Sequence, residues 1–221
     1  MSLFKRTLAN RVRASRAFDP LSMRTDLDRL REGGVNVLLS TVYAPERGII
    51  RECRYLQLMR YLLPRTWKMV FDRPHFDVTI EMLDAMEEQV KVSGTTQSGK
   101  PVAKMACSVQ ELNDILDERE SVAVIHNVEG AHSLDGRLDN VQRLFDRGVA
   151  YLTLAHFYAN EAVNPCFPYP ESVQHMGCFT RGRNLALGLE PFGDEVVEKM
   201  VELGMICLLY TSDAADESSR V

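Results

Sequence analysis

The sequence predicts an α/β fold in which helices cover a parallel β-sheet. Short apolar runs alternate along the chain with segments of helical periodicity, and each kind of segment recurs several times. The apolar runs are apolar throughout rather than alternately apolar and polar, which is typical of parallel strands buried on both faces. A barrel and a doubly wound sheet both fit this order. No glycine-rich phosphate motif follows any strand, which disfavours dinucleotide binding.

Strands and helices follow one another in the order that βα units require. The predicted strands are 35–41, 122–128, 149–154 and a further strand from 205. The predicted helices are 46–63, 76–90, 108–117, 138–147 and 191–204. The strand 35–41 follows two glycines and is expected to be buried.

Capping residues mark several of the expected helix ends. Ser108 and Glu111 have the spacing of a capping box at the start of a helix. Gly148 and Gly204 follow the last two predicted helices and are expected to end them in the left-handed conformation. Pro64 is expected to end the helix 46–63.

Two segments between these elements are expected to be loops. Residues 91–106 contain glycines and a proline between short apolar stretches, and they are predicted to form a loop or a hairpin-like excursion. Residues 160–182 are predicted to form a long loop, and loops of this length in a compact domain usually have a function.

Size and charge limit the class of protein. The chain has 221 residues, fewer than the roughly 250 of a complete (β/α)8 barrel. Its net charge is −5, which argues against a nucleic-acid binder. No apolar run reaches the length of a membrane span, so no membrane association is expected. The five cysteines form no CxxC pair and predict reduced thiols in a cytoplasmic protein.

Two predicted strands end in side chains that are suited to catalysis. Glu129 follows the strand 122–128, with His132 three residues further on, and His156 follows the strand 149–154. Functional groups of a (β/α) barrel lie at the carboxyl ends of its strands, and one helix joins these two strands, so they should be neighbours. A carboxylate can bind zinc, and an imidazole can bind metal or donate a hydrogen bond to a developing oxyanion.

Both side chains also have ordinary structural explanations. A glutamate at a strand end often caps a helix or pairs with a surface cation, and a histidine after an apolar strand is often packed and hydrogen-bonded. The pattern by itself therefore identifies Glu129 and His156 only as candidate site residues.

Three ordered segments resemble the membrane (renal) dipeptidase family of metallopeptidases. Residues 122–156 contain VEGAHS and AYLTLAH, which are similar to V-E-G-G-H-S and R-Y-L-T-L-T-H of that family. Residues 188–205, GLEPFGDEVVEKMVELGM, and residues 25–45, TDLDRLREGGVNVLLSTVYAP, are similar to two further family motifs. Ala131, Ala150 and Ala155 depart from the family pattern.

The resemblance implies a partial (β/α)8 TIM barrel of the metal-dependent hydrolase (amidohydrolase-like) type. The family holds two zinc ions in the barrel mouth, and the resemblance makes Glu129 the carboxylate that bridges them. A bridging hydroxide would attack the peptide bond of a dipeptide substrate. His156 would contact the substrate and stabilise the tetrahedral intermediate, and His132 would have a supporting role.

Other parts of the family pattern are absent from this sequence. The H-x-D metal motif has no counterpart upstream, and a D-x-(S/T)-H strand does not follow the last predicted helix. Residues 207–217, CLLYTSDAADE, instead match the translation of a transposase-adapter sequence, with a natural polar tail as the alternative. We therefore expect an incomplete dipeptidase barrel domain over residues 1–206 and a non-native tail over 207–221, and this chain is expected to be inactive.

Two other functions are compatible with these features. The first is a non-catalytic barrel relative that binds a ligand or a partner, and the second is another metal-dependent amidohydrolase. A homodimer is a candidate assembly for any of the three.

Overall fold

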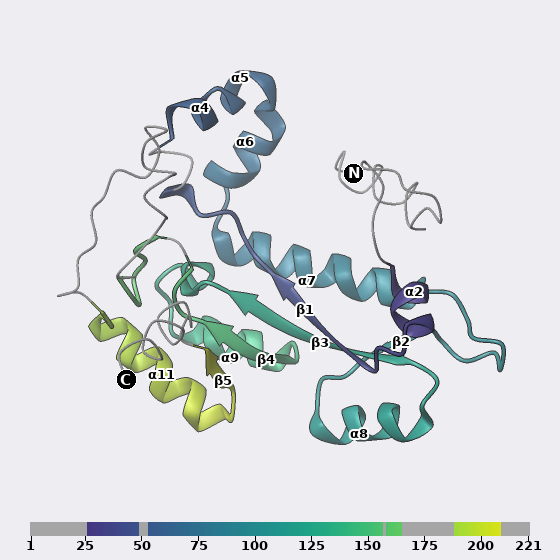
Figure 1. Cartoon of the computed structure of the whole chain (residues 1–221). Helices are drawn as coiled ribbons and strands as arrows, with labels where there is room; N and C mark the ends of the chain where they lie inside the picture. Colours follow the sequence, from purple (N-terminus) through teal and green to yellow (C-terminus); the bar gives the residue numbers. More distant parts are fainter. Residues whose placement is uncertain (1–25, 49–52, 157, 165–187, 209–221) are drawn as a thin grey trace, which may run out of the picture. The chain divides into compact units, whose positions relative to one another are not determined.

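The structure is a computed structural model that describes residues 26–48, 53–156, 158–164 and 188–208. Figure 1 shows its helices and strands in chain order. Contacts between residues divide the chain into two units. The first unit combines Met1–Leu39 with Met86–Ile125, and the second combines Ser40–Ala85 with His126–Val221.

Helices and strands alternate along much of the chain, as βα units require. The strands are β1 (Val37–Val42), β2 (Ala103–Met105), β3 (Val122–Glu129), β4 (Val149–Thr153) and β5 (Ile206–Leu208). The helices are α2 (Leu27–Glu32), α4 (Arg54–Gln57), α5 (Met59–Leu62), α6 (Pro64–Phe71), α7 (His75–Lys91), α8 (Val109–Glu118), α9 (Asp139–Asp146) and α11 (Pro191–Leu203), with a 3-10 turn η1 (Ala131–Leu134).

The strands form one sheet with the order β1-β3-β4-β5, and β2 pairs with β3. The pairs β2–β3, β3–β4 and β4–β5 are all parallel. This confirms the predicted α/β fold with a parallel sheet. Parallel strands end at the same edge of a sheet, so the segments that follow β3 and β4 leave the sheet on one side.

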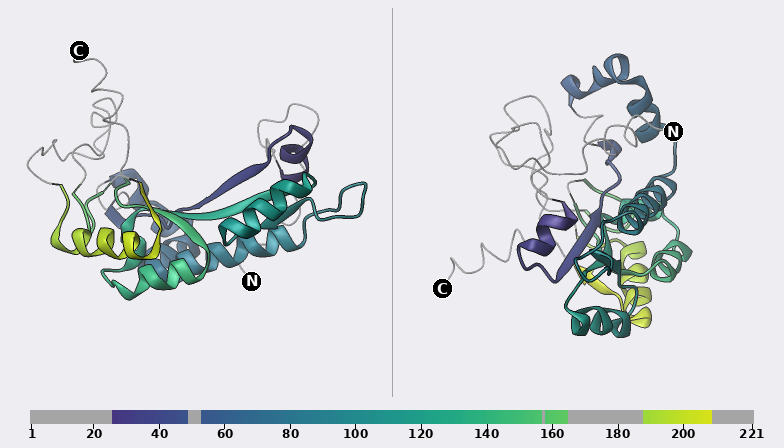
Figure 2. Two further views of the ribbon diagram at one scale, coloured as in Figure 1. Left: turned by 90° about the horizontal axis from the view of Figure 1, so that it is seen from below. Right: turned by 90° about the vertical axis from the view of Figure 1, so that its right-hand side faces the viewer.

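The core of the second unit lies between the sheet and its helices. Helices α9 and α11 lie side by side and pack against β4 and β5 (Figures 1 and 2). Leu83 of α7, Leu144 of α9, Leu152 of β4 and Met200 of α11 are fully buried there. Each such side chain stabilises the fold by about 1.5–3 kcal/mol relative to an exposed one.

The first unit has its own apolar contacts around β2 and the start of β3. Val90, Ala103, Val122 and Val124 form one buried cluster, and Ile115 of α8 belongs to another. Helix α8 begins with the predicted capping box.

One hydrogen bond of that capping box is shifted by one residue from the usual pattern. The Ser108 hydroxyl accepts a hydrogen bond from the Glu111 amide at 3.2 Å. The Glu111 carboxylate in turn accepts from the Cys107 amide at 2.7 Å, one residue before the cap. The Glu111 amide of the first turn and the Cys107 amide before the cap therefore both have side-chain acceptors.

Several expected element ends are confirmed and one is wrong. Gly148 and Gly204 adopt φ of 77° and 72°, as glycines that end helices in the left-handed conformation do. Pro64 instead begins α6, where its missing N–H costs nothing because the first-turn amides have no helical partner. The segment 46–63 is accordingly not one helix but includes the short helices α4 and α5.

The expectation that the first strand is buried is also wrong in part. Along β1, Val37 is 37% exposed and Leu39 is 50% exposed, whereas Val42 is buried. The strand lies at one end of the described strand order, so no described strand pairs with its outer edge. The segment 91–106 is hairpin-like as predicted, with an antiparallel bridge between Thr95 and Pro101, but it also contains the short strand β2.

The cysteines do not all have the predicted reduced state. Cys53 is disulfide-bonded, whereas Cys107 and Cys207 are free. No described helix is long and apolar enough to cross a lipid bilayer. Most of the predicted loop 160–182 lies outside the described residues, as do residues 209–221 of the predicted tail.

Candidate functional site

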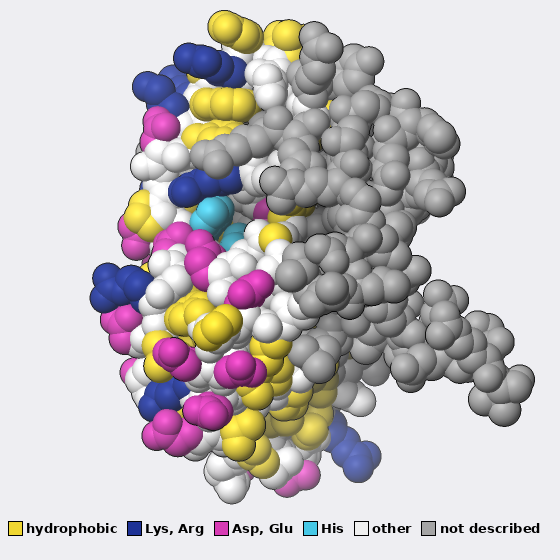
Figure 3. All heavy atoms as spheres, turned by 90° about the vertical axis from the view of Figure 1, so that its left-hand side faces the viewer, with side chains coloured by type: hydrophobic (Ala, Val, Ile, Leu, Met, Phe, Trp, Pro, Cys, Tyr) yellow, Lys and Arg dark blue, Asp and Glu magenta, His cyan; other side chains and the backbone are white. Residues whose placement is uncertain are grey.

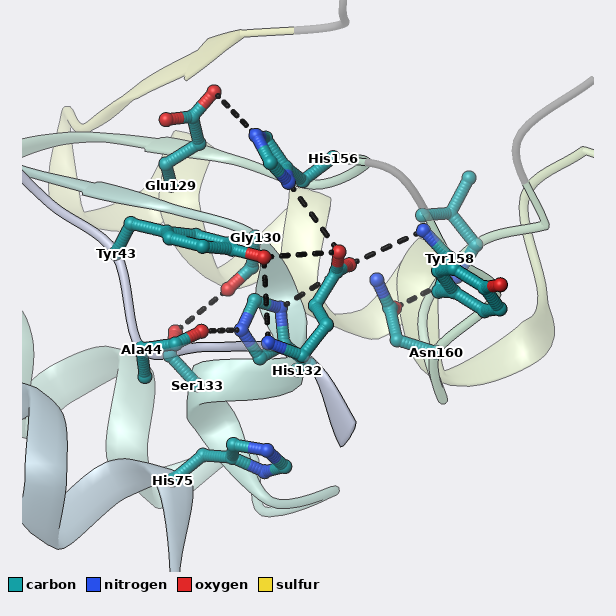
Figure 4. A network of polar contacts seen from close by, with 12 residues as sticks. Tyr43, Ala44, His75, Glu129, Gly130, His132, Ser133, His156, Tyr158 and Asn160 are labelled. Atoms are coloured by element: carbon teal, nitrogen blue, oxygen red, sulfur yellow. Dashed lines mark hydrogen bonds and ion pairs between the residues drawn. The ribbon is translucent and has the colours of Figure 1, made fainter. Parts of the chain in front are cut away.

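Polar side chains from the ends of three strands meet within the second unit (Figure 4). Glu129 is the last residue of β3, and His156 follows β4. The segment after β1 contributes Tyr43 and Glu46. Strands β1, β3 and β4 are consecutive in the sheet, so these groups come from neighbouring strand ends.

The residues after β3 turn sharply because of Gly130. This glycine has φ of +94°, a conformation that side chains rarely adopt. A Cβ atom at this position would lie 2.3 Å from the His132 ring, so only glycine leaves room for that imidazole. The Ser133 hydroxyl donates to the Gly130 carbonyl at 2.7 Å and closes the turn. The VEGAHS sequence therefore positions Glu129 at the strand end and folds His132 beneath it.

His156 lies between two carboxylates. Its Nε2 is 3.4 Å from Glu129 Oε1, and its Nδ1 is 3.3 Å from Glu46 Oε2 (Figure 4). The Tyr43 ring packs on the imidazole with 4.4 Å between ring centroids. The His156 side chain is 9% exposed, whereas that of Glu129 is 26% exposed. Glu129 is therefore the more accessible end of this contact.

Glu46 is a buried carboxylate that polar groups surround. Its Oε1 accepts a hydrogen bond from the Tyr158 amide at 3.2 Å, and its Oε2 accepts one from the Tyr43 hydroxyl at 3.3 Å. Burial opposes ionisation, but the hydrogen bond with His156, the charge of His132 and the Tyr158 amide outweigh it and lower the pKa of Glu46. Glu46 is therefore ionised at neutral pH.

His132 is buried in the 3-10 turn η1, near Glu46. Its Nε2 lies 2.7 Å from the Ala44 carbonyl oxygen, and its Nδ1 lies 3.8 Å from Glu46 Oε1. Burial lowers the pKa of His132, although the contact with Ala44 opposes the shift.

His75, at the start of α7, packs edge-on against His132 with 5.1 Å between ring centroids. Burial and the Arg47 charge lower the pKa of His75. The Asp135 carboxylate accepts hydrogen bonds from the His75 and Phe76 amides at 3.1 and 2.8 Å. This carboxylate therefore caps the N-terminus of α7.

The described residues do not by themselves form a metal site. No group of three or more histidine, cysteine, aspartate or glutamate side chains within the described ranges is arranged to hold a metal ion. Catalytic zinc generally has three protein ligands. Glu129 and His156 are thus fewer groups than a zinc ion requires.

The structure brings the two predicted site residues, Glu129 and His156, into contact. Sequence reasoning missed Glu46 and Tyr43, although they follow a predicted strand as the two candidates do. Extending the strand-end argument to the first strand would have found both residues. On the face drawn in Figure 3, histidine side chains reach the surface beside acidic ones.

Comparison with known proteins places this chain in a family. The family model for membrane dipeptidase, peptidase family M19, matches residues 4–216. The chain belongs to the membrane dipeptidase family. The match covers the elements that carry Glu46, Glu129 and His156.

The individual relatives have low sequence identity to this chain and are longer than it. The chain is 29% identical over 196 residues to mouse Dipeptidase 3, which covers 86% of this chain and 30% of the relative. It is 26% identical over 199 residues to an uncharacterized dipeptidase of Schizosaccharomyces pombe, with 86% and 39% covered. The chain thus spans about a third of the length of these relatives.

Solved structures share the fold at low sequence identity. A metallopeptidase from Rhodobacter sphaeroides, liganded with a phosphinate mimic of the dipeptide L-Ala-D-Ala, matches with a TM-score of 0.60 and 14% identity over 93% of this chain and 54% of its own. An amidohydrolase from Pseudomonas aeruginosa matches with a TM-score of 0.54 and 15% identity over 82% and 40%. A dipeptidase described as a metallopeptidase of family M19 also matches, with a TM-score of 0.53. Together with the parallel sheet, these matches confirm the predicted α/β fold class.

Proposed function

We propose that the protein to which this chain belongs is a zinc-dependent dipeptidase. One observation carries the proposal: Glu129 and His156 leave adjacent strand ends and meet at 3.4 Å in a chain of the membrane dipeptidase family. In this arrangement a carboxylate and an imidazole lie in direct contact at neighbouring strand ends. Hydrolysis of a peptide bond needs groups that can hold a nucleophile and stabilise a developing oxyanion.

Within this proposal, His156 acts on the substrate. Its Nε2 faces Glu129, whose side chain is 26% exposed and so more accessible than those of His156 and Glu46. From there it would donate a hydrogen bond to the carbonyl oxygen of the scissile bond as negative charge develops. Loss of a single donor of this kind lowers kcat by about 10²–10³-fold.

Glu129 would be a ligand for the two zinc ions that the proposal includes, as the carboxylate shared between them. The described residues supply too few ligands for either ion, so the others would come from parts of the protein that the structure does not describe. We therefore assign no reaction step to the metal. Because the sequence also lacks the upstream H-x-D motif and the D-x-(S/T)-H strand of the family, we propose that the 221-residue chain alone does not hydrolyse dipeptides.

The test compares two proteins, the 221-residue chain and the complete product of its gene, each purified with zinc. Both are assayed on a panel of dipeptides, with N-acetylated amino acids and lactams as control substrates. The proposal expects hydrolysis of dipeptides by the complete product alone. Hydrolysis of only the control substrates would instead favour another amidohydrolase, and no hydrolysis of any substrate would favour a non-catalytic relative. Dipeptide hydrolysis by the 221-residue chain would refute the incomplete site.

A further inference from the structure

The segment after β4 that carries His156 is closed by the side chain of Asn160 (Figure 4). Nδ2 of Asn160 donates a hydrogen bond to the Leu154 carbonyl oxygen at 3.0 Å. Its Oδ1 accepts hydrogen bonds from the Ala162 and Val163 amides at 2.9 and 3.2 Å. These three bonds join residues before His156 to residues after it. They therefore restrict where the imidazole can lie relative to the end of the strand.

The orientation of the Asn160 amide group is decided by its partners. The Ala162 and Val163 N–H groups can only donate, and the Leu154 carbonyl oxygen can only accept. The opposite orientation would place the NH2 group against two donors and the oxygen against an acceptor, so all three hydrogen bonds would be lost. Asn160 therefore has one donor arm toward Leu154 and one acceptor arm toward the end of the segment.

The Leu154 carbonyl oxygen also joins the two strand ends of the site. It accepts a second hydrogen bond, from the Ala131 amide at 3.0 Å. Ala131 is two residues beyond Glu129, and Leu154 is two residues before His156. A carbonyl oxygen has two lone pairs, so the Ala131 amide and Asn160 together use its full capacity. The distance between Glu129 and His156 therefore depends on this junction.

Asn160 acts through the backbone rather than on the reacting groups. Among the described residues, its side-chain hydrogen bonds all go to backbone atoms. The Leu154 side chain is fully buried and fixes the start of the segment. Glu46 holds the segment at a second point, because it accepts from the Tyr158 amide at 3.2 Å. His156 lies between these two points of attachment.

We propose that Asn160 is a positioning residue for His156, and that its hydrogen bond to Leu154 holds the imidazole beside Glu129. Without the donor arm, the backbone that carries His156 can move away from the junction of the two strand ends. A displacement of about 1 Å in a group that acts on the substrate can lower the rate about a hundredfold. The consequence for catalysis rests on the proposed dipeptidase function, whereas the place of the imidazole does not.

The first test is proton NMR of the aromatic rings in the 221-residue chain. Ring centroids of Tyr43 and His156 lie 4.4 Å apart, and those of His75 and His132 lie 5.1 Å apart, so both pairs should give nuclear Overhauser cross-peaks. Asn160→Asp keeps the acceptor arm but replaces the donor with an oxygen. We expect this variant to lose most of the Tyr43–His156 intensity and to keep that of His75–His132.

A second asparagine of the same segment supplies the matched control. The Asn164 side chain donates to the Glu190 carboxylate and so makes a contact outside the closed segment. Asn164→Ala should leave both pairs of cross-peaks unchanged. Tyr43–His156 cross-peaks of wild-type intensity in Asn160→Asp would overturn the proposal, and so would an equal loss in both ring pairs, since that would show general damage.

Kinetics of the complete gene product test whether Asn160 acts through His156. Asn160→Asp should lower kcat for a dipeptide about ten- to a hundredfold while KM changes little, because His156 is proposed to act in the transition state. Once the imidazole is removed, a residue that only positions it has no further effect. His156→Ala with Asn160→Asp should therefore match the kcat of His156→Ala alone within about twofold. A further loss as large as in the wild-type background would overturn the proposal.

Failure of this proposal and failure of the proposed function give different results. A complete gene product that hydrolyses no dipeptide would refute the proposed function, while the ring cross-peaks would still decide the role of Asn160. Tyr43–His156 cross-peaks that survive Asn160→Asp would refute the role of Asn160 and leave the proposed function standing.

Discussion

Replacing Gly193 with alanine tests how closely α11 packs on the segment after β4. Gly193 is buried in the first turn of α11. A Cβ atom there would lie 2.1 Å from the Ala162 carbonyl oxygen and 2.7 Å from a methyl group of Leu189. The leucine could move, but the carbonyl belongs to the backbone and also accepts a hydrogen bond from the Glu190 amide at 2.9 Å.

The expected cost follows from these distances. The gap between Cβ and the Ala162 oxygen must widen from 2.1 Å to at least the 3.4 Å of ordinary contact. Overpacking of this kind costs about 1–3 kcal/mol, and weakening the Glu190 hydrogen bond costs about 1 kcal/mol more. Alanine regains at most about 1 kcal/mol as a better helix former than glycine. The free energy of unfolding should therefore fall by about 1–3 kcal/mol.

Urea unfolding followed by far-UV circular dichroism measures this change. Gly188→Ala is the matched control, because Gly188 is exposed and a Cβ atom there meets nothing within 4 Å. We expect that control to change the free energy of unfolding by less than about 1 kcal/mol. A Gly193→Ala protein as stable as the wild type, or as the control, would refute the packing argument.

Three further predictions concern stability. Burial lowers the pKa of His75 and of His132 in the folded state, so the unfolded chain binds more protons than the folded chain below about pH 6.5. The free energy of unfolding should therefore be constant above that pH and fall below it, by up to about 1.4 kcal/mol per pH unit for each histidine. A free energy of unfolding from urea titrations that is the same from about pH 7 to 5 would contradict this. Asp135→Ala should cost about 1–2 kcal/mol in the same assay by uncapping α7, with Asp135→Asn closer to the wild type because it keeps one acceptor. Ser108→Ala should lower the melting temperature through loss of about 1 kcal/mol at the α8 cap, and a wild-type value would show that the cap contributes nothing.

Local signals in the sequence were sufficient for much of the fold. The strands β3 and β4, the caps of α8 and the glycines that end α9 and α11 are all short-range features, and each is where the pattern predicts it. Pro64 was assigned wrongly because a proline fits both after a helix and in its first turn, and the sequence alone does not distinguish these.

The site was predictable only in part because one of its contacts joins residues that are far apart in the sequence. Glu129 and His156 come directly after apolar strands, so the topology of a parallel sheet brings them together. Glu46 meets His156 across 110 residues of sequence, from a segment whose helical periodicity concealed its position after β1. Long-range contacts of this kind depend on how the strands are ordered, which local periodicity does not determine.

The most direct test of the proposed site is the kcat/KM of the complete gene product for one dipeptide that it accepts. Glu129→Gln should lower this value by at least about a hundredfold, since it removes a proposed metal ligand beside His156. Glu118→Gln, at the exposed end of α8, is the matched control and should leave it unchanged. Equal kcat/KM values for the Glu129→Gln and wild-type proteins would contradict the site described here.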